Sequence, residues 1–283
     1  MGFTSEGIEN SSSEVPREIR RLIVNGFALA PAGANVIMQL SQLGVGHGVV
    51  ESRVASGSLY RHPFKRTRTT LSYIMIAGFG TIEERTALRA AVNVQHRQVR
   101  SLSTDAVRYN AFDPDLQLWV AACMYRGVLD SIAFLYGEQD AATLDEIYRF
   151  CARFATTLQV PESAWPRDRV AFERYWRRAV STIEFDATTR EYLLDLASLG
   201  FLAFPFRIVL APVHRFVTAG FLPREFRDQL GLVWSPWREA VFAGVLKAAA
   251  AVNRVLPTPL REFPWNLTLR DAKRRIALGR PLV

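Results

Sequence analysis

The sequence predicts a single all-α domain built from several helices. Along its 283 residues the apolar side chains recur mostly at three- and four-residue spacing, which is the period of one helix face. No segment alternates polar and apolar residues as a half-buried strand does, and no stretch resembles a linker long enough to separate two domains. We therefore expect a flexible polar N-terminal segment, residues 1–16, followed by one multi-helix globular domain over residues 17–283.

Capping signals place the helices of the first half. Thr81 and Glu84 have the spacing of a capping box, so we expect a helix over residues 82–100. Asp113 followed by a proline is a second start signal, and Gly137 is a suitable end for that helix. The glycine-rich residues 44–48 predict a turn rather than a phosphate-binding loop, because no strand precedes them.

The second half is punctuated by Asp, Pro and Gly residues that separate further helices. One helix is expected from near Asp140 to before Pro161, and another after Pro166. The remaining helices are expected over residues 188–199, 208–219, 223–231, 236–255 and 267–278.

The composition excludes several classes of function. The net charge is +8, but the 35 basic residues are dispersed and no DNA-reading motif accompanies them, so no nucleic-acid partner is expected. Cys123 and Cys151 are isolated, which excludes a zinc ribbon and a redox dithiol and indicates two reduced thiols. The HExxH, GxSxG, GxxxxGK[ST] and CxxCH motifs are absent, and their absence disfavours most familiar active sites.

The sequence carries no targeting or membrane-spanning signal. Its start lacks the basic end, apolar stretch and cleavage site of a secretory signal, so we expect a cytoplasmic protein. The most apolar stretches, residues 199–206 and 241–252, are shorter than the roughly 20 residues that a spanning helix needs. No transmembrane segment is expected, while a peripheral membrane contact is compatible with the sequence.

His96 is the most informative of the four histidines. On the predicted helix it follows Leu88 and Val92 at four-residue steps and precedes Val99 by three, so it belongs to the stripe that faces the interior. Two interpretations stay open. The ring is either a core histidine satisfied by a backbone carbonyl, or a ligand to a metal or haem iron.

Arg66 and Thr70 are four residues apart and share one face of a helix that begins near Pro63, with Tyr73 on the same side. Taken alone, an arginine here is more often a solvated charge than a catalytic group. The following residues 73–80 are too apolar for the surface, however, so this face must turn inward. A buried arginine requires an anion, which either a carboxylate or a ligand could supply.

Five segments occur in the order and spacing of a known family. They are AGANVIMQ at residues 32–39, Arg66 and Thr70 with Gly78 and Gly80, VNVQHRQVR at residues 92–100, the block from Tyr109 to Val120, and LP at residues 222–223 before LGL at residues 230–232. From about residue 32 to residue 233, the chain resembles the MpaB-type and rubber-oxygenase catalytic domain, a family that includes the latex clearing proteins.

The resemblance implies an all-helical fold that encloses a b-type haem, with His96 as the proximal iron ligand. It also places Arg66 and Thr70 near the haem, where the arginine would balance negative charge at a propionate or at bound oxygen. Both roles agree with the expectations from the residues alone, because a haem would supply an anion for Arg66 and a metal for His96.

Three positions depart from the family pattern. Thr69 stands where some rubber oxygenases have a lysine that can occupy the distal iron position, so distal ligation by lysine is not expected. Ala121 replaces the histidine of the family's Trp-Val-His. Glu51 lies near the place where some members carry a catalytic carboxylate and is a candidate base, although the local match is loose.

The activity implied by the resemblance is that of a haem b-dependent oxygenase which uses O2 to attack an apolar small molecule. Oxidative cleavage of an isoprenoid double bond is one such reaction, with the oxidative chemistry belonging to the cofactor. An intracellular terpenoid, quinone tail or lipid would suit a pocket lined by the abundant Phe, Leu and Trp, although most of the 18 Phe residues belong to core packing.

Two other classes of function stay open. A non-haem iron enzyme could use His47, Glu51 and His96 as a two-histidine, one-carboxylate ligand set. Gly46 and Gly48 argue against a firm helix at the first two of these ligands. A non-catalytic helical protein could instead use its basic clusters to bind nucleic acid or an anionic membrane surface.

Overall fold

The computed structural model describes residues 15–52, 54 and 57–282. Within this part of the chain the regular structure is helical, and one isolated bridge between Arg100 and Asn110 is the only β-type pairing. The all-α prediction is therefore confirmed. The predicted flexible segment, residues 1–16, lies outside the described residues except for its last two positions.

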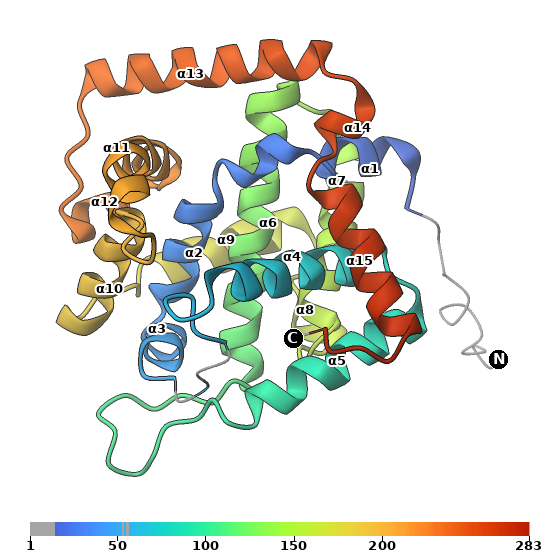
Figure 1. Cartoon of the computed structure of the whole chain (residues 1–283), viewed down its shortest axis with the longest axis vertical. Helices are drawn as coiled ribbons and strands as arrows, with labels where there is room; N and C mark the ends of the chain where they lie inside the picture. The colour runs from blue at the N-terminus through green and yellow to red at the C-terminus, as the bar shows by residue number, and fades with distance from the viewer. Residues whose placement is uncertain (1–14, 53, 55–56, 283) are drawn as a thin grey trace.

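The helices follow the order of the chain (Figure 1). They are α1 (Arg17–Ile23), η1 (Gly26–Leu29), α2 (Ala32–Leu40), α3 (Leu43–Val50), α4 (Pro63–Phe79), α5 (Ile82–His96), α6 (Pro114–Tyr136), α7 (Ala141–Cys151), α8 (Arg153–Thr156), η3 (Glu162–Ala164), α9 (Arg169–Val180), α10 (Ala187–Ala197), α11 (Phe204–Phe221), α12 (Arg224–Leu230), α13 (Pro236–Val255), α14 (Thr258–Arg261) and α15 (Trp265–Ala277).

Helix α6 forms the centre of the fold, and α2, α8, α13 and α1 pack around it (Figure 1). Its start and end follow the predicted signals. The Asp113 carboxylate accepts a hydrogen bond from the Asp115 backbone N–H at 2.8 Å, and Gly137 ends the helix with a φ of 77°. The proline at the first helical position needs no hydrogen-bond partner, because its nitrogen carries no proton.

By length and composition, α6 could cross a membrane, and so could α1 with Gly26–Leu40 if that bent pair were one span. Half of the apolar window of α6 is buried inside the protein, and neighbouring helices pack along its length. These properties are those of a core helix, which is apolar on most sides because protein surrounds it. We therefore assign α6 to the core.

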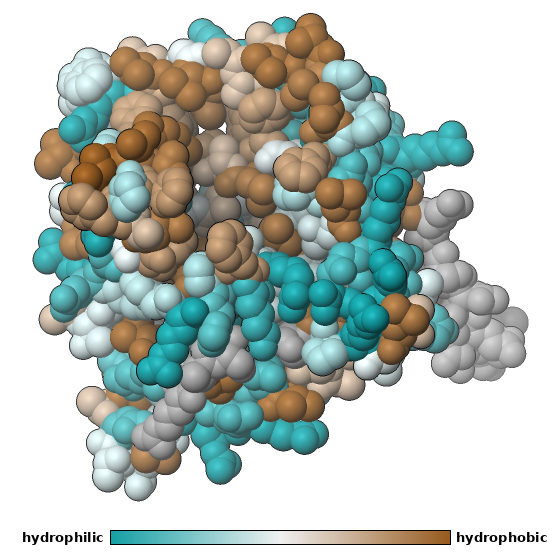
Figure 2. Space-filling view, in the orientation of Figure 1, coloured by the Kyte–Doolittle hydropathy of each residue, from teal (hydrophilic) through white to brown (hydrophobic). Residues whose placement is uncertain are grey.

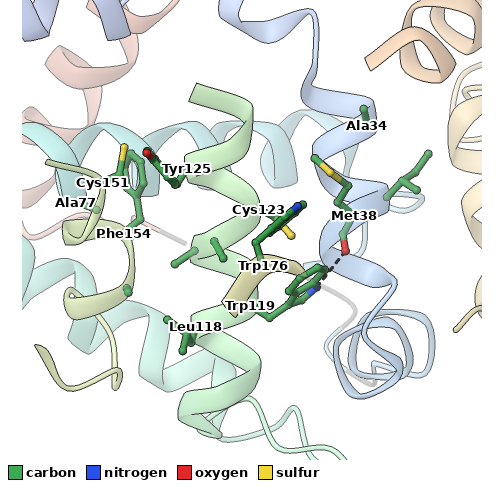
Figure 3. Close-up of a cluster of buried hydrophobic side chains, with 14 of the residues drawn as sticks. Ala34, Met38, Ala77, Leu118, Trp119, Cys123, Tyr125, Cys151, Phe154 and Trp176 are labelled. Carbon is green, nitrogen blue, oxygen red and sulfur yellow. Dashed lines mark hydrogen bonds between the residues drawn. The ribbon is translucent and has the colours of Figure 1, made fainter. Parts of the chain in front are cut away.

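Trp119 joins α6 to the end of α2 (Figure 3). Its buried indole N–H lies 3.1 Å from the carbonyl oxygens of both Met38 and Gln39, and its ring stacks on Trp176 at a centroid distance of 5.2 Å. The last carbonyls of a helix have no partner within the helix, so this indole provides a donor to Gln39 and a further donor to Met38, whose carbonyl also accepts from the Ser41 hydroxyl at 2.7 Å.

The segment at residues 32–39 brings α2 close to two other helices. Gly33 lies against α11, where a β-carbon would stand 2.5 Å from the Thr218 hydroxyl. The Asn35 amide donates to the Cys123 carbonyl oxygen at 2.5 Å, and Gly127 leaves room for that amide. Small residues at these positions are therefore required by close helix packing.

Several predicted boundaries and one predicted turn differ from the structure. The helix expected over residues 82–100 ends at His96, the helix expected over residues 208–219 begins at Phe204, and the helix expected from Asp140 to Pro161 is divided at Ala152 into α7 and α8. The turn predicted at residues 44–48 is wrong, since these residues belong to α3. At Gly46, a β-carbon would lie 2.7 Å from both the Leu40 carbonyl oxygen and Thr189, so this glycine permits close packing.

We expect Trp119→Ala to lower the free energy of unfolding by about 3–5 kcal/mol, because it removes a buried ring and the N–H that donates to the Met38 and Gln39 carbonyl oxygens. Urea denaturation measures the change. The matched control is Trp237→Ala on α13, where the side chain is exposed and the expected change is within about 0.5 kcal/mol. Equal losses in the two variants would contradict the assigned role of Trp119.

Candidate functional site

Helices α4 and α5 bring the predicted site residues to one region of the fold. Helix α4 begins at Pro63 and carries Arg66 and Thr70 in its first half, while α5 ends at His96. The start of α5 is fixed by the predicted capping box, in which the Thr81 hydroxyl accepts from the Glu84 N–H and the Glu84 carboxylate accepts from the Thr81 N–H. The C-terminal helix α15 packs along α4 (Figure 1).

The His96 imidazole is half-buried and its Nδ1 atom is buried without a hydrogen-bond partner. Burial lowers the pKa of His96 to about 4, and the nearby positive charge of Arg66 lowers the same pKa further. The ring is therefore neutral at physiological pH, which is the form that ligates metals. The Phe112 ring lies edge-on to the imidazole at a centroid distance of 6.1 Å.

Two other histidines show how this fold satisfies an imidazole that has a structural role. The Nδ1 atom of His214 lies 2.9 Å from the Ala197 carbonyl oxygen, and both ring nitrogens of His47 face carboxylates. The interpretation of His96 as an ordinary core histidine required a carbonyl at its buried nitrogen, and the structure places none there. A buried nitrogen without a partner is uncommon and calls for a ligand or another explanation.

Arg66 is exposed, yet the protein around it is dense enough that burial lowers the pKa of its guanidinium. The expected inward position of this residue is therefore not met in full, because its side chain stays accessible while neighbouring protein crowds it. Among the described residues no carboxylate forms an ion pair with Arg66, and the group with an electrostatic effect on its pKa is the Tyr192 phenol of α10. The anion that the sequence analysis required is therefore not supplied by a protein carboxylate.

Thr70 lies one helical turn beyond Arg66, as predicted. It is exposed, and its hydroxyl donates to the Arg66 carbonyl oxygen at 3.0 Å. Tyr73, on the same side, donates from its hydroxyl to the Phe154 carbonyl oxygen at 2.6 Å and so attaches this face of α4 to α8. The structure thus brings Arg66 and Thr70 together on one face and sets Arg66 near His96.

The sequence analysis missed a polar chain that continues from Arg66 into α10 and α11. The Tyr192 phenol has an electrostatic effect on the pKa of Arg66, and its ring centroid lies 5.3 Å from that of Tyr60. The Tyr60 hydroxyl donates to Asp195 at 2.6 Å, and the other oxygen of Asp195 accepts from Arg207 at 3.0 Å. No local sequence signal could have identified this chain, because its members come from three separate segments.

Glu51, the candidate base, lies at the end of α3 and is engaged by His47. The Glu51 Oε1 atom is 2.8 Å from His47 Nδ1, and the other ring nitrogen of His47 is 2.5 Å from Asp186 Oδ2. Asp186 is also the N-cap of α10, where its carboxylate accepts from the Thr189 N–H. The buried imidazole therefore connects the end of α3 to the start of α10.

The alternative iron site formed by His47, Glu51 and His96 is not assembled. These three residues lie in the described part of the chain, where no group of three His, Cys, Asp or Glu side chains is arranged to hold a metal ion. His47 and Glu51 are bonded to each other, and His96 lies instead near Arg66.

The His47 cluster predicts a pH-dependent stability. Burial lowers the pKa of His47, but its hydrogen bonds with Asp186 and Glu51 outweigh burial and hold the pKa above its usual 6.5. The stabilisation is complete below 6.5 and is lost as the pH rises through the folded-state pKa. Urea denaturation should therefore show a larger deficit for His47→Gln just below pH 6.5 than well above it. The exposed control His62→Gln should show none, and a deficit for His47→Gln that is independent of pH would contradict the charge argument.

A second prediction concerns the pair formed by Arg66 and His96. Removal of the positive charge in Arg66→Leu favours protonation of the neighbouring ring, so the pKa of His96 should rise above about 4. An NMR titration of the His96 ring protons measures the shift. Arg149→Leu, which removes an exposed charge on α7, should leave that pKa unchanged. An unchanged pKa of His96 in the Arg66→Leu variant would show that the two side chains do not interact.

Comparison with known proteins agrees with this arrangement. The family described as ER-bound oxygenase mpaB/B'/Rubber oxygenase, catalytic domain, matches residues 20–252. Two relatives, uncharacterized protein Mb2261 of Mycobacterium bovis and uncharacterized protein Rv2237 of Mycobacterium tuberculosis, are each 49% identical over 255 residues, which is 90% of this chain and 100% of each relative. No solved structure gives a significant match. The chain belongs to the mpaB and rubber oxygenase catalytic-domain family.

Proposed function

We propose that this protein is a haem b-dependent oxygenase that uses O2 to oxidise an apolar small molecule, with His96 as the proximal iron ligand. The observation that carries the proposal is the His96 imidazole, which is neutral and has a buried nitrogen with no partner. Membership of an oxygenase family supports the reaction class, because the match covers the helices that carry His96, Arg66 and Thr70.

The residues around His96 fit a haem. A b-type haem offers an iron, which needs a neutral imidazole, and two propionates, which need cations. The chain provides a neutral imidazole at His96 and, beside it, the Arg66 guanidinium without a carboxylate partner. A ligand carrying negative charge would therefore find an unpaired guanidinium beside the imidazole, and a charge-assisted hydrogen bond between them would complete the site.

The haem, when bound, supplies the activation of O2. The chain's own residues would perform the remaining tasks. His96 would hold the iron, and the Arg66 guanidinium would balance a propionate carboxylate and orient the bound group. The Thr70 hydroxyl, exposed on the same helical face, would offer a hydrogen bond toward the same space.

Glu51 would serve as the base in this proposal. Its carboxylate shares a hydrogen bond with His47, so a proton accepted at Glu51 would be held between these two side chains. The apolar character assigned to the substrate is supported by the rings beside the polar groups, since Phe112 contacts His96 and Tyr60 contacts Tyr192. Terpenoids, quinone tails and lipids are the compound classes that such surroundings would accept.

We expect the protein, produced with sufficient iron and haem precursor, to show a Soret band that is lost in His96→Ala. Added imidazole should restore the band in that variant, because a free ring can occupy the volume left by the missing side chain. Absorption spectroscopy and the haem content per chain measure both effects.

The matched control for this experiment is His62→Ala, which changes an exposed histidine at the N-cap of α4 and should keep full haem content. A circular dichroism spectrum equal to that of the wild type would show that His96→Ala is folded. A folded His96→Ala variant with full haem content would refute the ligand assignment, and a wild-type protein that stays colourless when loaded with haem would refute the cofactor.

A further inference from the structure

Helix α13 carries an apolar stripe that no other part of the described chain covers. The stripe residues are spaced by four, four, three, four and three positions, so they lie within one face of the helix. They are Trp237, Val241, Val245, Ala248, Val252 and Val255, and all six are exposed. The inner face of α13 is different, because Phe242, Ala250 and Asn253 are buried against the domain. The stripe is therefore a second, outward apolar face.

The first half of α11 is also apolar and exposed, and the buried residues of this helix, Thr218 and Ala219, lie near its end. The exposed apolar side chains of this helix are Phe204, Phe206, Ile208, Val209, Leu210 and Val213. Figure 2 shows apolar side chains gathered over α11 and along α13 on the same side of the molecule. We call the exposed apolar residues of these two helices the α11–α13 face.

Basic side chains border this face. Helices α11 and α13 contain five basic residues and one acidic residue, Glu239, which accepts a hydrogen bond from the Trp234 indole. At roughly 100° per residue, Arg238 lies beside the α13 stripe, while Lys247 and Arg254 lie farther round the helix, between the stripe and the buried face. Among the described residues, Lys247 and Arg254 have no carboxylate partner. The border is therefore positively charged and free to bind anions.

An open cavity of about 940 Å³ lies between α11 and the start of α13. Its wall includes Phe204 and Ile208 of the exposed half of α11 and Trp237 of the α13 stripe. Arg207 and Arg215 of α11 contribute to the same wall. The mouth of an apolar cavity thus opens among the residues of the α11–α13 face.

We propose that the α11–α13 face binds the surface of an anionic lipid bilayer, with the stripe of α13 lying in the interfacial layer. Large exposed apolar patches mark sites of protein or membrane contact, and an apolar helix face flanked by Lys and Arg is the pattern of a helix that lies in a membrane interface. Long basic side chains at the flanks can reach the phosphates while their stems stay in the apolar layer.

Charge distinguishes the bilayer from a second copy of this chain. Two α11–α13 faces placed together would bring one set of basic residues against another with a single acidic residue on each side, so like charges would oppose each other. An anionic bilayer has the opposite charge and attracts the same residues. Helix α13 does not qualify as a span by length and composition, and its charged residues require that it lie on the membrane.

Trp237 provides the reporter for the test. All six tryptophans lie in the described part of the chain, and Trp237, with 63% of its surface accessible, is the one that is exposed. With vesicles of phosphatidylcholine and phosphatidylglycerol, we expect the full-length protein to co-sediment and its tryptophan emission to shift to shorter wavelength. Brominated lipids should quench that emission, and Trp237→Phe should keep vesicle binding while losing the response.

Paired variants distinguish the apolar contribution to vesicle binding from the electrostatic one. Val241→Asp combined with Val245→Asp should weaken vesicle binding by at least about tenfold, because charges replace apolar groups in the interface. The matched control is Val170→Asp, an exposed apolar position on α9, which should bind as the wild type does. Lys247→Glu with Arg254→Glu should abolish the preference for anionic lipid, while Arg149→Glu on α7 should retain it.

The result is independent of the proposed cofactor, since His96→Ala should bind vesicles normally. Vesicle binding that is equal in the wild type and the stripe variants would overturn the proposal, as would an unchanged emission of Trp237 in the bound state. The protein could instead fail to bind vesicles and form a dimer that becomes a monomer when Val241 and Val245 are replaced by Asp. That result would show that a second copy covers the α11–α13 face.

Discussion

The contact between α2 and α6 sets the positions of the helices that pack on α2, namely α3 and α11. At one end of α2 the Trp119 indole bonds the last carbonyls of the helix, and in its middle the Asn35 amide bonds the Cys123 carbonyl. Because these bonds are buried or partly buried, sliding α2 along α6 would break several of them at once. Helix α3 begins three residues after α2 ends, so the position of His47 follows from the same contact. Gly33 then allows α11 to approach α2 from the other side.

The helix ends that carry a side-chain cap could be predicted from the sequence, since a cap and the groups it satisfies are neighbours in the chain. Thr81, Asp113 and Gly137 act in the structure as their sequence patterns indicate. The glycines of residues 44–48 misled the prediction because glycine has two uses, a turn and a close packing contact, and only the neighbouring helix distinguishes them. Periodicity likewise identified the apolar residues of α13 but not that one apolar stripe of this helix is exposed, because a repeat shows a face and not what covers it.

The candidate site could likewise be predicted only in part from the sequence. Spacing placed Arg66 and Thr70 on one face, and an inward position for His96 followed from its apolar stripe, but their approach to each other depends on the packing of α4 and α5. The resemblance to the oxygenase family implied that pairing, because it places both residues near one haem. Neither residue spacing nor the family resemblance could predict the interaction partners that come from distant segments of the chain. Tyr192 beside Arg66 and Asp186 beside His47 are more than 100 residues away from those side chains.

The proposed oxygenase site and the proposed membrane face meet at α10. Tyr192 on this helix has an electrostatic effect on Arg66. Ser198, just past the end of α10, lines the cavity that opens at the α11–α13 face. Six residues separate Tyr192 from Ser198, which corresponds to roughly 9 Å along a helix axis. An apolar substrate dissolves in the bilayer rather than in water, so its concentration is highest beside that cavity. Arg207, which lines the cavity and pairs with Asp195, connects its wall to the polar chain that leads to the site. A protein with this arrangement could take an apolar molecule from the membrane through that cavity and oxidise it at the site beside Tyr192.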